Sequence, residues 1–307
     1  MFVFVLGTGR CGSSLIHEVL ARHPDVGFLS NIDDNLGGLD LGGRWNGAIF
    51  RRVPPSFAQK GRLRYAPSEG YRVLDRQVAP ILSAPCRDLV ASDVTPWLGQ
   101  RTREFFHRRR AVQGKPTFLH KFTGWPRAGF LHEVFPDARF VHVVRDGRAV
   151  ANSWLQMSWW TGWSGPDRWS WGPLAPAYRQ AWEDSDRSFV TLAGLNWRLL
   201  LDAFEAARAL LPEEAWLEVR YEDVIAEPDK QFAAMLDFAG LPWSSGFSAG
   251  FGRYAFNSRR SDAFRRDLDP ANLARLEAVI ADPLERYGYP VEVADRPVNG
   301  YPVELTG

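Results

Sequence analysis

A glycine-rich loop close to the start of the chain has the residue types of an anion-binding turn. It reads Gly7-Thr8-Gly9-Arg10-Cys11-Gly12-Ser13-Ser14, and its backbone N–H groups, with the N-terminus of a following helix, could hold a phosphate or a sulfate. A nucleotide triphosphatase needs a Gly-Lys pair in such a loop, whereas Ser13 follows Gly12 here. Arg10 supplies a cation instead. The loop therefore predicts an anion site without the usual magnesium context, although packing alone can also force such a turn.

An arginine and a serine near the middle of the chain could bind a second anion. Arg145 follows the apolar run 138–144, and a helix entered at Gly147 would carry Ser153 about 12 Å further on. The guanidinium of an arginine can donate to two phosphate oxygens at once, and the serine hydroxyl adds a neutral hydrogen-bond donor. The alternative for Arg145 is an exposed ion pair with Asp146. Two separated anion sites suit a ligand that carries two separated phosphate groups.

Together with a third motif, these residues resemble the sulfotransferases that use 3′-phosphoadenosine 5′-phosphosulfate (PAPS). The loop Arg10-Cys11-Gly12-Ser13-Ser14, followed by His23-Pro24-Asp25-Val26, is similar to that of carbohydrate sulfotransferases in particular. Residues 140–148 with Ser153 resemble the strand of the family that runs into Arg-Asp-x-Arg. Residues 219–224 resemble its third motif. The resemblance runs from the first strand to roughly Tyr289 and is weak across two insertions.

The resemblance implies a role for each motif. The loop would grip the 5′-phosphosulfate, Arg145 and Ser153 would hold the 3′-phosphate, and Tyr221 would lie beside the adenine. The family also places a basic loop over the 3′-phosphate, and its nearest counterpart here is Ser258-Arg259-Arg260. The usual glycine-containing signature is absent from that segment, so a solvated loop is the alternative.

The residues that would act on the transferred group are less well matched. The family places a lysine at the end of the third strand, and Lys121 lies there, where its ammonium could stabilise charge on the oxygen that leaves sulfur. A solvated strand end is the alternative. The family glutamate that acts as general base maps to about Asn31, which cannot accept a proton. We therefore expect Asp33 or Asp34 to serve, with His120 as the runner-up. The alternatives are solvated turn residues for the two aspartates and a core histidine for His120.

Composition excludes several other classes of protein. The chain has 307 residues, 45% of them hydrophobic, and a net charge of +1, so no general attraction to nucleic acid is expected. It contains two cysteines, which rules out a disulfide scaffold and favours a reducing compartment. Residues 1–6 are apolar but too short for a signal sequence or a membrane span. We expect a cytoplasmic protein with no integral membrane segment and no metal.

The elements that must position these residues follow from periodicity. Apolar runs predict strands over 2–6, 117–122, 138–144 and 216–219, and helical periods predict helices from Ser13 and over 189–211, 228–241 and 270–281. His17 falls off the apolar face of the first helix and is expected to be exposed. Alternating strands and helices predict an α/β, P-loop-like three-layer fold with a central parallel sheet flanked by helices.

The chain is predicted to be a single domain, 1–307, with insertions near 31–113 and 156–187. The second insertion contains six tryptophans, which could line an acceptor pocket or form a satellite hydrophobic cluster: Trp159, Trp160, Trp163, Trp169, Trp171 and Trp182. The first contains five arginines expected to form one charged helix face: Arg101, Arg103, Arg108, Arg109 and Arg110.

These observations predict an enzyme that moves a sulfonyl group from PAPS to a hydroxyl or amine by in-line displacement. The acceptor would be a small molecule, a carbohydrate or a lipid-like alcohol. Two alternatives remain open at this point. One is a nucleotide kinase built on the same loop, and the other is a PAPS- or nucleotide-binding protein without catalytic activity.

Overall fold

The computed structural model describes residues 1–35, 42–53, 65–257 and 261–291. The chain divides into two compact units, which are described separately. The first consists of Met1–Arg145 and Leu200–Ser258, and the second of Asp146–Leu199 and Arg259–Gly307. The single domain with two insertions stays a prediction.

The first unit is built on a five-stranded parallel sheet. Its strands are β1 (Phe2–Gly7), β2 (Val26–Phe28), β3 (Thr117–Thr123), β4 (Arg139–Val144) and β5 (Trp216–Arg220), in the order β2-β3-β1-β4-β5. Every neighbouring pair of strands is parallel. This confirms the predicted α/β class and the four predicted strands. The three-residue strand β2 was not predicted, because so short a run has no distinct pattern.

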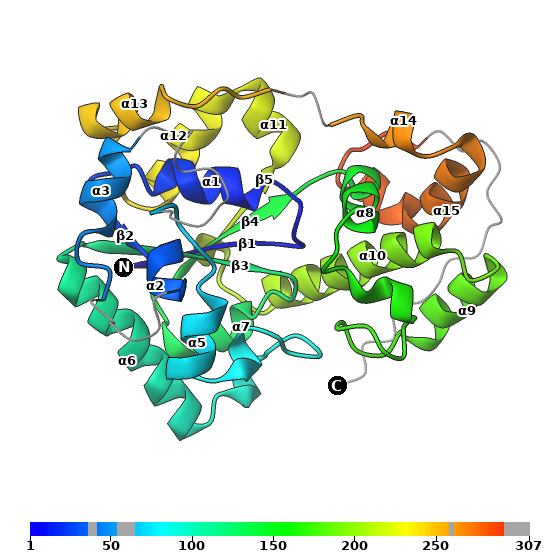
Figure 1. Ribbon diagram of the computed structural model, residues 1–307, viewed down its shortest axis with the longest axis horizontal. Coiled ribbons are helices and arrows are strands. Elements are labelled where there is room, and N and C mark those ends of the chain that lie inside the picture. The colour runs from blue at the N-terminus through cyan, green and yellow to red at the C-terminus, as the bar shows by residue number, and fades with distance from the viewer. Residues whose placement is uncertain (36–41, 54–64, 258–260, 292–307) are drawn as a thin grey trace. The chain divides into compact units, whose positions relative to one another are not determined.

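Side chains alternate between the two faces of the sheet, and each face has its own hydrophobic core. From β1, Phe2, Phe4 and Leu6 pack with aromatic residues of α6 (Pro96–Gln113) and α7 (Ala128–Val134). Val3 and Val5 point to the opposite core, with α1 (Ser13–Leu20) and α12 (Pro228–Phe238). Helices thus cover both faces (Figure 1), as the three-layer prediction requires.

Shorter helices complete the first unit. They are α2 (Asn31–Asn35), α3 (Asn46–Arg52), α5 (Tyr71–Gln77), α11 (Tyr221–Ala226) and α13 (Ser245–Phe251), with the 3-10 turns η1 (Pro80–Leu82), η2 (Ala91–Asp93) and η4 (Glu213–Ala215). The long helix α10 (Phe189–Ala209) contributes its residues 200–209 to this unit.

Two predicted exposures are wrong. His17 is 1% exposed, because the buried face of α1 is wide enough to include it: Ser13, Ile16, His17, Val19 and Leu20 are all buried. Arg109 is also buried, so the five arginines of the first insertion do not form one solvated face. The Arg109 side chain folds back along α6, where it donates to the carbonyl of Phe105 and to Gln77.

The second unit is helical in its described residues. It consists of α8 (Gly147–Leu155), η3 (Thr161–Ser164), α9 (Pro176–Asp184), residues 189–199 of α10, α14 (Phe264–Asp267) and α15 (Pro270–Arg286). The helix predicted over 270–281 continues five residues further, past Pro283. Tryptophans dominate its core: Trp154, Trp169, Trp182 and Trp197 are all buried.

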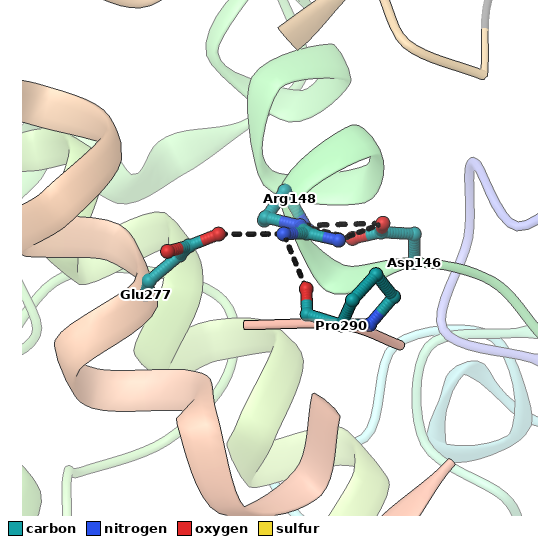
Figure 2. A network of polar contacts seen from close by, with 4 residues as sticks. All are labelled: Asp146, Arg148, Glu277 and Pro290. Carbon is teal, nitrogen blue, oxygen red and sulfur yellow. Dashed lines mark hydrogen bonds and ion pairs between the residues drawn. The ribbon is translucent and has the colours of Figure 1, made fainter. Parts of the chain in front are cut away.

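A buried arginine holds two helices of the second unit together (Figure 2). The guanidinium of Arg148 on α8 donates to Asp146 at 2.7 Å, to Glu277 on α15 at 2.5 Å and to the Pro290 carbonyl at 2.9 Å. Burial lowers the pKa of Arg148, but the carboxylates of Asp146 and Glu277 outweigh burial, so this pKa is raised and the arginine stays charged.

Candidate active site

The carboxyl ends of β1, β3 and β4 lie next to one another. In the sheet, Gly7 at the end of β1 pairs with Thr123 of β3 on one side and with Val143 of β4 on the other. The chain leaves β1 to build one edge of the sheet through β2 and later crosses back to build the other edge through β4. Ligands of open α/β sheets bind at such a switch point, outside the carboxyl ends of the strands.

The glycine-rich loop occupies this position and turns sharply into α1. Gly9, Arg10 and Gly12 all adopt left-handed backbone conformations, with φ of 83°, 57° and 93°. Arg10 accepts a conformation that is costly for a residue with a side chain, so its neighbours must hold it. Gly12 caps α1, and no side chain of the described residues caps that helix end. Backbone N–H groups at such an end are suited to an anion.

Gly12 is required for a second reason, which is its contact with Tyr221. A Cβ atom added to Gly12 would lie 2.1 Å from Cδ2 of the Tyr221 ring. The aromatic ring therefore packs directly on the backbone of the loop. This close approach brings the third predicted motif to the first, although the two are far apart in the sequence.

Arg145 joins the same cluster. Its Nη1 donates to the carbonyl of Arg10 at 2.9 Å, and its guanidinium lies 4.7 Å from the centroid of the Tyr221 ring. The structure thus brings together Arg10, Gly12, Arg145 and Tyr221, all predicted to contact the donor. Asp146, the residue that follows Arg145, caps α8 and forms an ion pair with Arg148.

Lys121 reaches the loop from β3. It lies on the face of the sheet that α1 covers, is 4% exposed, and donates from Nζ to Ser14 Oγ at 2.7 Å. The same Nζ atom lies 2.8 Å from Oε1 of Glu69. Lys121 is therefore not a solvated strand end, because its ammonium is fixed between a loop hydroxyl and a carboxylate.

Glu69 was missed by the sequence analysis. It lies in the first insertion, two residues before α5, and no motif marks it. Burial raises the pKa of its carboxyl, but the charge and the hydrogen bond of Lys121 outweigh burial, so the pKa of Glu69 is lowered from its ordinary value. A carboxylate with a lowered pKa is ionised at neutral pH.

Comparison with known proteins assigns the chain to a family. The profile described as "Sulfotransferase family" matches residues 3–245, which is most of the chain. The chain belongs to the sulfotransferase family. It is therefore an enzyme of a class whose reaction is sulfonyl transfer, as the sequence resemblance implied.

Two relatives and one solved structure are similar to this sulfotransferase. Protein-tyrosine sulfotransferase 1 of Danio rerio is 27% identical over 94% of the chain and 72% of its own length. Protein-tyrosine sulfotransferase A of Caenorhabditis elegans is 22% identical over 79% of the chain, which spans half of that relative. The sulfotransferase domain of the Synechococcus PCC 7002 olefin synthase has the same fold, with a TM-score of 0.55 at 16% identity over 95% of both chains.

The residues predicted to act as base in this sulfotransferase are engaged elsewhere. Asp33 accepts through Oδ2 from the backbone N–H and the hydroxyl of Ser30, at 2.8 and 2.9 Å. Asp34 accepts from the backbone N–H of Val73 at 3.0 Å. His120 is fully buried on the face of β3 opposite to Lys121, against Phe106 and other rings of that core. Burial holds its pKa well below the ordinary value.

The other predicted donor contacts lie in the second unit or outside the described residues. Ser153 is half-buried on α8 of the second unit. Ser258, Arg259 and Arg260 lie outside the described residues. Their proposed roles at the 3′-phosphate therefore stay predictions.

The tryptophan-rich segment divides into packed and exposed residues. Trp160 is 5% exposed and its indole N–H donates to Asn196 on α10 at 3.2 Å. Trp169 and Trp182 belong to the core of the second unit. Trp159 and Trp163 are 50% and 69% exposed. Only these two project a largely exposed ring from the segment, so an acceptor contact must be sought there first.

Two features are absent from the part of the chain that the structure describes. None of the described helices has both the length and the apolar character needed to cross a membrane. No three or more His, Cys, Asp or Glu side chains gather there in a way that could hold a metal ion.

Proposed function

We propose that this sulfotransferase moves the sulfonyl group of PAPS to a hydroxyl or amine of its acceptor by in-line displacement. The observation that supports this most is the convergence of Arg145, Tyr221 and the backbone of Arg10 at the glycine-rich loop. A loop, a cation and an aromatic ring are what a nucleotide with two phosphate positions requires. The cluster lies at the switch point of the sheet.

In this proposal the loop residues Gly9 to Ser14 hold the 5′-phosphosulfate through their backbone N–H groups and the start of α1. Arg145, with Ser153 and the segment 258–260, holds the 3′-phosphate, and Tyr221 lies beside the adenine. Arg10 and Lys121 stabilise the charge that develops on the bridging oxygen as the S–O bond breaks. Lys121 is suited to this task because it is already held at Ser14, the last residue of the loop.

The acceptor is proposed to carry its hydroxyl on a ring or an alkyl chain. The sequence favours a carbohydrate or lipid-like alcohol, since exposed tryptophans bind such surfaces. Trp159 and Trp163 are the residues available for that contact. The names of the two relatives add a phenolic hydroxyl, that of a tyrosine side chain, to the candidates. The proposed location is the cytoplasm.

The test compares nucleotides before any acceptor is known. Calorimetry should show that adenosine 3′,5′-bisphosphate (PAP) binds much more tightly than ATP or adenosine 5′-phosphate, because PAP engages both anion sites. Radiolabelled PAPS should then transfer its label to members of a panel of sugars, alcohols and phenols. Tighter binding of ATP than of PAP would contradict the proposal and point to a nucleotide kinase. PAP binding without transfer to any acceptor would point to a binding protein.

A further inference from the structure

A carboxylate lies beside the lysine that is proposed to assist the leaving group. Oε1 of Glu69 is 2.8 Å from Nζ of Lys121, and the same Nζ is 2.7 Å from Oγ of Ser14. The Glu69 side chain is 31% exposed, whereas that of Lys121 is 5% exposed. Glu69 is therefore the member of the pair that a molecule arriving from solvent can reach.

The backbone holds Glu69 in this position from both sides. The segment before it is bonded to the chain that follows β2: Asn31 donates its N–H to the Ala66 carbonyl at 3.0 Å, and Ser68 donates to the Leu29 carbonyl at 2.9 Å. After it, Tyr71 is tied to the end of β3, because its hydroxyl accepts from the Thr123 N–H at 3.0 Å. Glu69 is thus fixed at the carboxyl edge of the sheet, where the donor loop also lies.

These contacts also explain how a base can be supplied although Asn31 cannot serve. Residues 66–68 run antiparallel to residues 29–31, with a bridge between Ser30 and Pro67. A carboxylate carried by this neighbouring segment arrives at the same end of the sheet. Asp33 and Asp34 point their oxygens at backbone N–H groups instead.

We propose that Glu69 is the general base of this sulfotransferase, an inference that rests on the proposed function. As the acceptor oxygen forms its bond to sulfur, its proton passes to the Glu69 carboxylate. The bond between sulfur and the bridging oxygen breaks at the same time, and its electron pair stays on the phosphate of PAP. Lys121 then stabilises that oxygen, so one ion pair serves both ends of the transfer.

A purely structural ion pair has different consequences from a general base. A structural pair orients Lys121 in the same way for every acceptor, so its loss would slow all acceptors equally. A base is needed only where the acceptor still carries its proton. The titratable groups that act on Glu69 are Lys121 and, further back on β3, His120. His120 is fully buried and kept neutral, so an acidic limb in the pH profile would report Glu69.

The test uses two phenols with labelled PAPS as donor at mildly alkaline pH. 4-Methylphenol keeps its proton there, whereas 4-nitrophenol is largely ionised and needs no base. For Glu69→Gln we expect kcat with 4-methylphenol to fall about 10²–10⁴-fold, and kcat with 4-nitrophenol to fall far less. The acidic limb of the 4-methylphenol profile should disappear. Glu104→Gln, an exposed carboxylate on α6, is the matched control and should behave as the wild type.

Two measurements without turnover separate the possible failures. PAP binding by calorimetry should be as tight in Glu69→Gln as in the wild type, or tighter, because a negative charge is removed near the donor. Thermal unfolding should show that the variant is folded. Equal losses of kcat with both phenols, or no loss with either, would overturn the role of Glu69 as base. The proposed donor would still be supported in that case, provided that PAP binds. Failure of the wild type to bind PAP, or to transfer label to any acceptor of the panel that includes these phenols, would overturn the proposed function and this inference with it.

Discussion

The guanidinium of Arg145 lies over the ring of Tyr221, 4.7 Å from its centroid, and donates a hydrogen bond to the carbonyl of Arg10. The end of β4, the start of α11 and the glycine-rich loop are therefore one cluster. The contact between a guanidinium and an aromatic face is a cation–π interaction, which helps to fix the position of Arg145.

Replacing Arg145 by alanine should weaken PAP binding much more than binding of adenosine 5′-phosphate. Loss of a charge-assisted contact with the 3′-phosphate costs roughly 2–5 kcal/mol of binding free energy. The 5′-phosphate still binds to the glycine-rich loop, so its contribution is unchanged. Calorimetry with both nucleotides measures the difference. Arg103→Ala removes an exposed arginine of α6 and should change neither affinity. Equal losses for the two nucleotides would place Arg145 away from the 3′-phosphate.

Replacing Lys121 by methionine should lower kcat more than it raises the KM for PAPS. The ammonium acts mainly as the bridging oxygen gains charge, and stabilisation made only in the transition state appears in kcat. Steady-state kinetics with a phenol acceptor separates the two constants. A variant with unchanged kcat and a raised KM would make Lys121 a binding residue only.

Asp88 should make the stability of the protein depend on pH. Burial raises the pKa of this carboxyl, whereas the hydrogen bond from the Arg127 N–H and the charge of Arg127 lower it. Burial is the larger effect, so the pKa rises from 3.8 to about 6. The folded state therefore binds the proton more tightly, so its stability falls as pH rises from about 4 to about 6, by at most about 3 kcal/mol. Asp88→Asn keeps an acceptor for Arg127 and removes the titration. Denaturation of the wild type and of Asp88→Asn should show that the difference between their free energies of unfolding changes with pH across this range. A difference that does not change with pH would contradict the prediction.

Trp160 and Trp163 form a matched pair for the role of the tryptophan-rich segment. Trp160→Ala should lower the free energy of unfolding by about 3–5 kcal/mol, because it leaves a cavity beside Asn196. Trp163→Ala should change stability by less than about 0.5 kcal/mol. If Trp163 contacts the acceptor, its variant should raise the acceptor KM at unchanged PAP affinity. An unchanged KM would remove the ring from the acceptor site.

Arg148→Met should destabilise the second unit by about 3–5 kcal/mol, because it leaves the carboxylates of Asp146 and Glu277 without their partner. Chemical denaturation followed by tryptophan fluorescence measures this loss. Arg179→Met removes an arginine from an exposed ion pair with Asp167 and should have little effect. Similar results for the two variants would contradict a stabilising role for the network in Figure 2.

The sequence predicted the sheet and the loop well because both depend on local patterns. Alternation along β3 even separates Lys121 from His120, which point to opposite faces. It could not predict Glu69, since its partner Lys121 lies in another element and nothing in the residues around Glu69 marks the pairing. His17 shows a related limit: the apolar pattern of α1 leaves it outside the apolar face, but the packing around α1 buries it together with Ile16, Val19 and Leu20.

The contact between Gly12 and Tyr221 has a consequence for the order in which the chain acquires its parts. The loop leaves the ribosome well before the ring that packs on it and the arginine that holds the Arg10 carbonyl, since Arg145 is 135 residues away from Arg10. Closing such long loops is slow compared with forming a helix. This cluster is therefore completed only when α11 has emerged, and a shorter nascent chain carries the loop without the Tyr221 ring that packs on it.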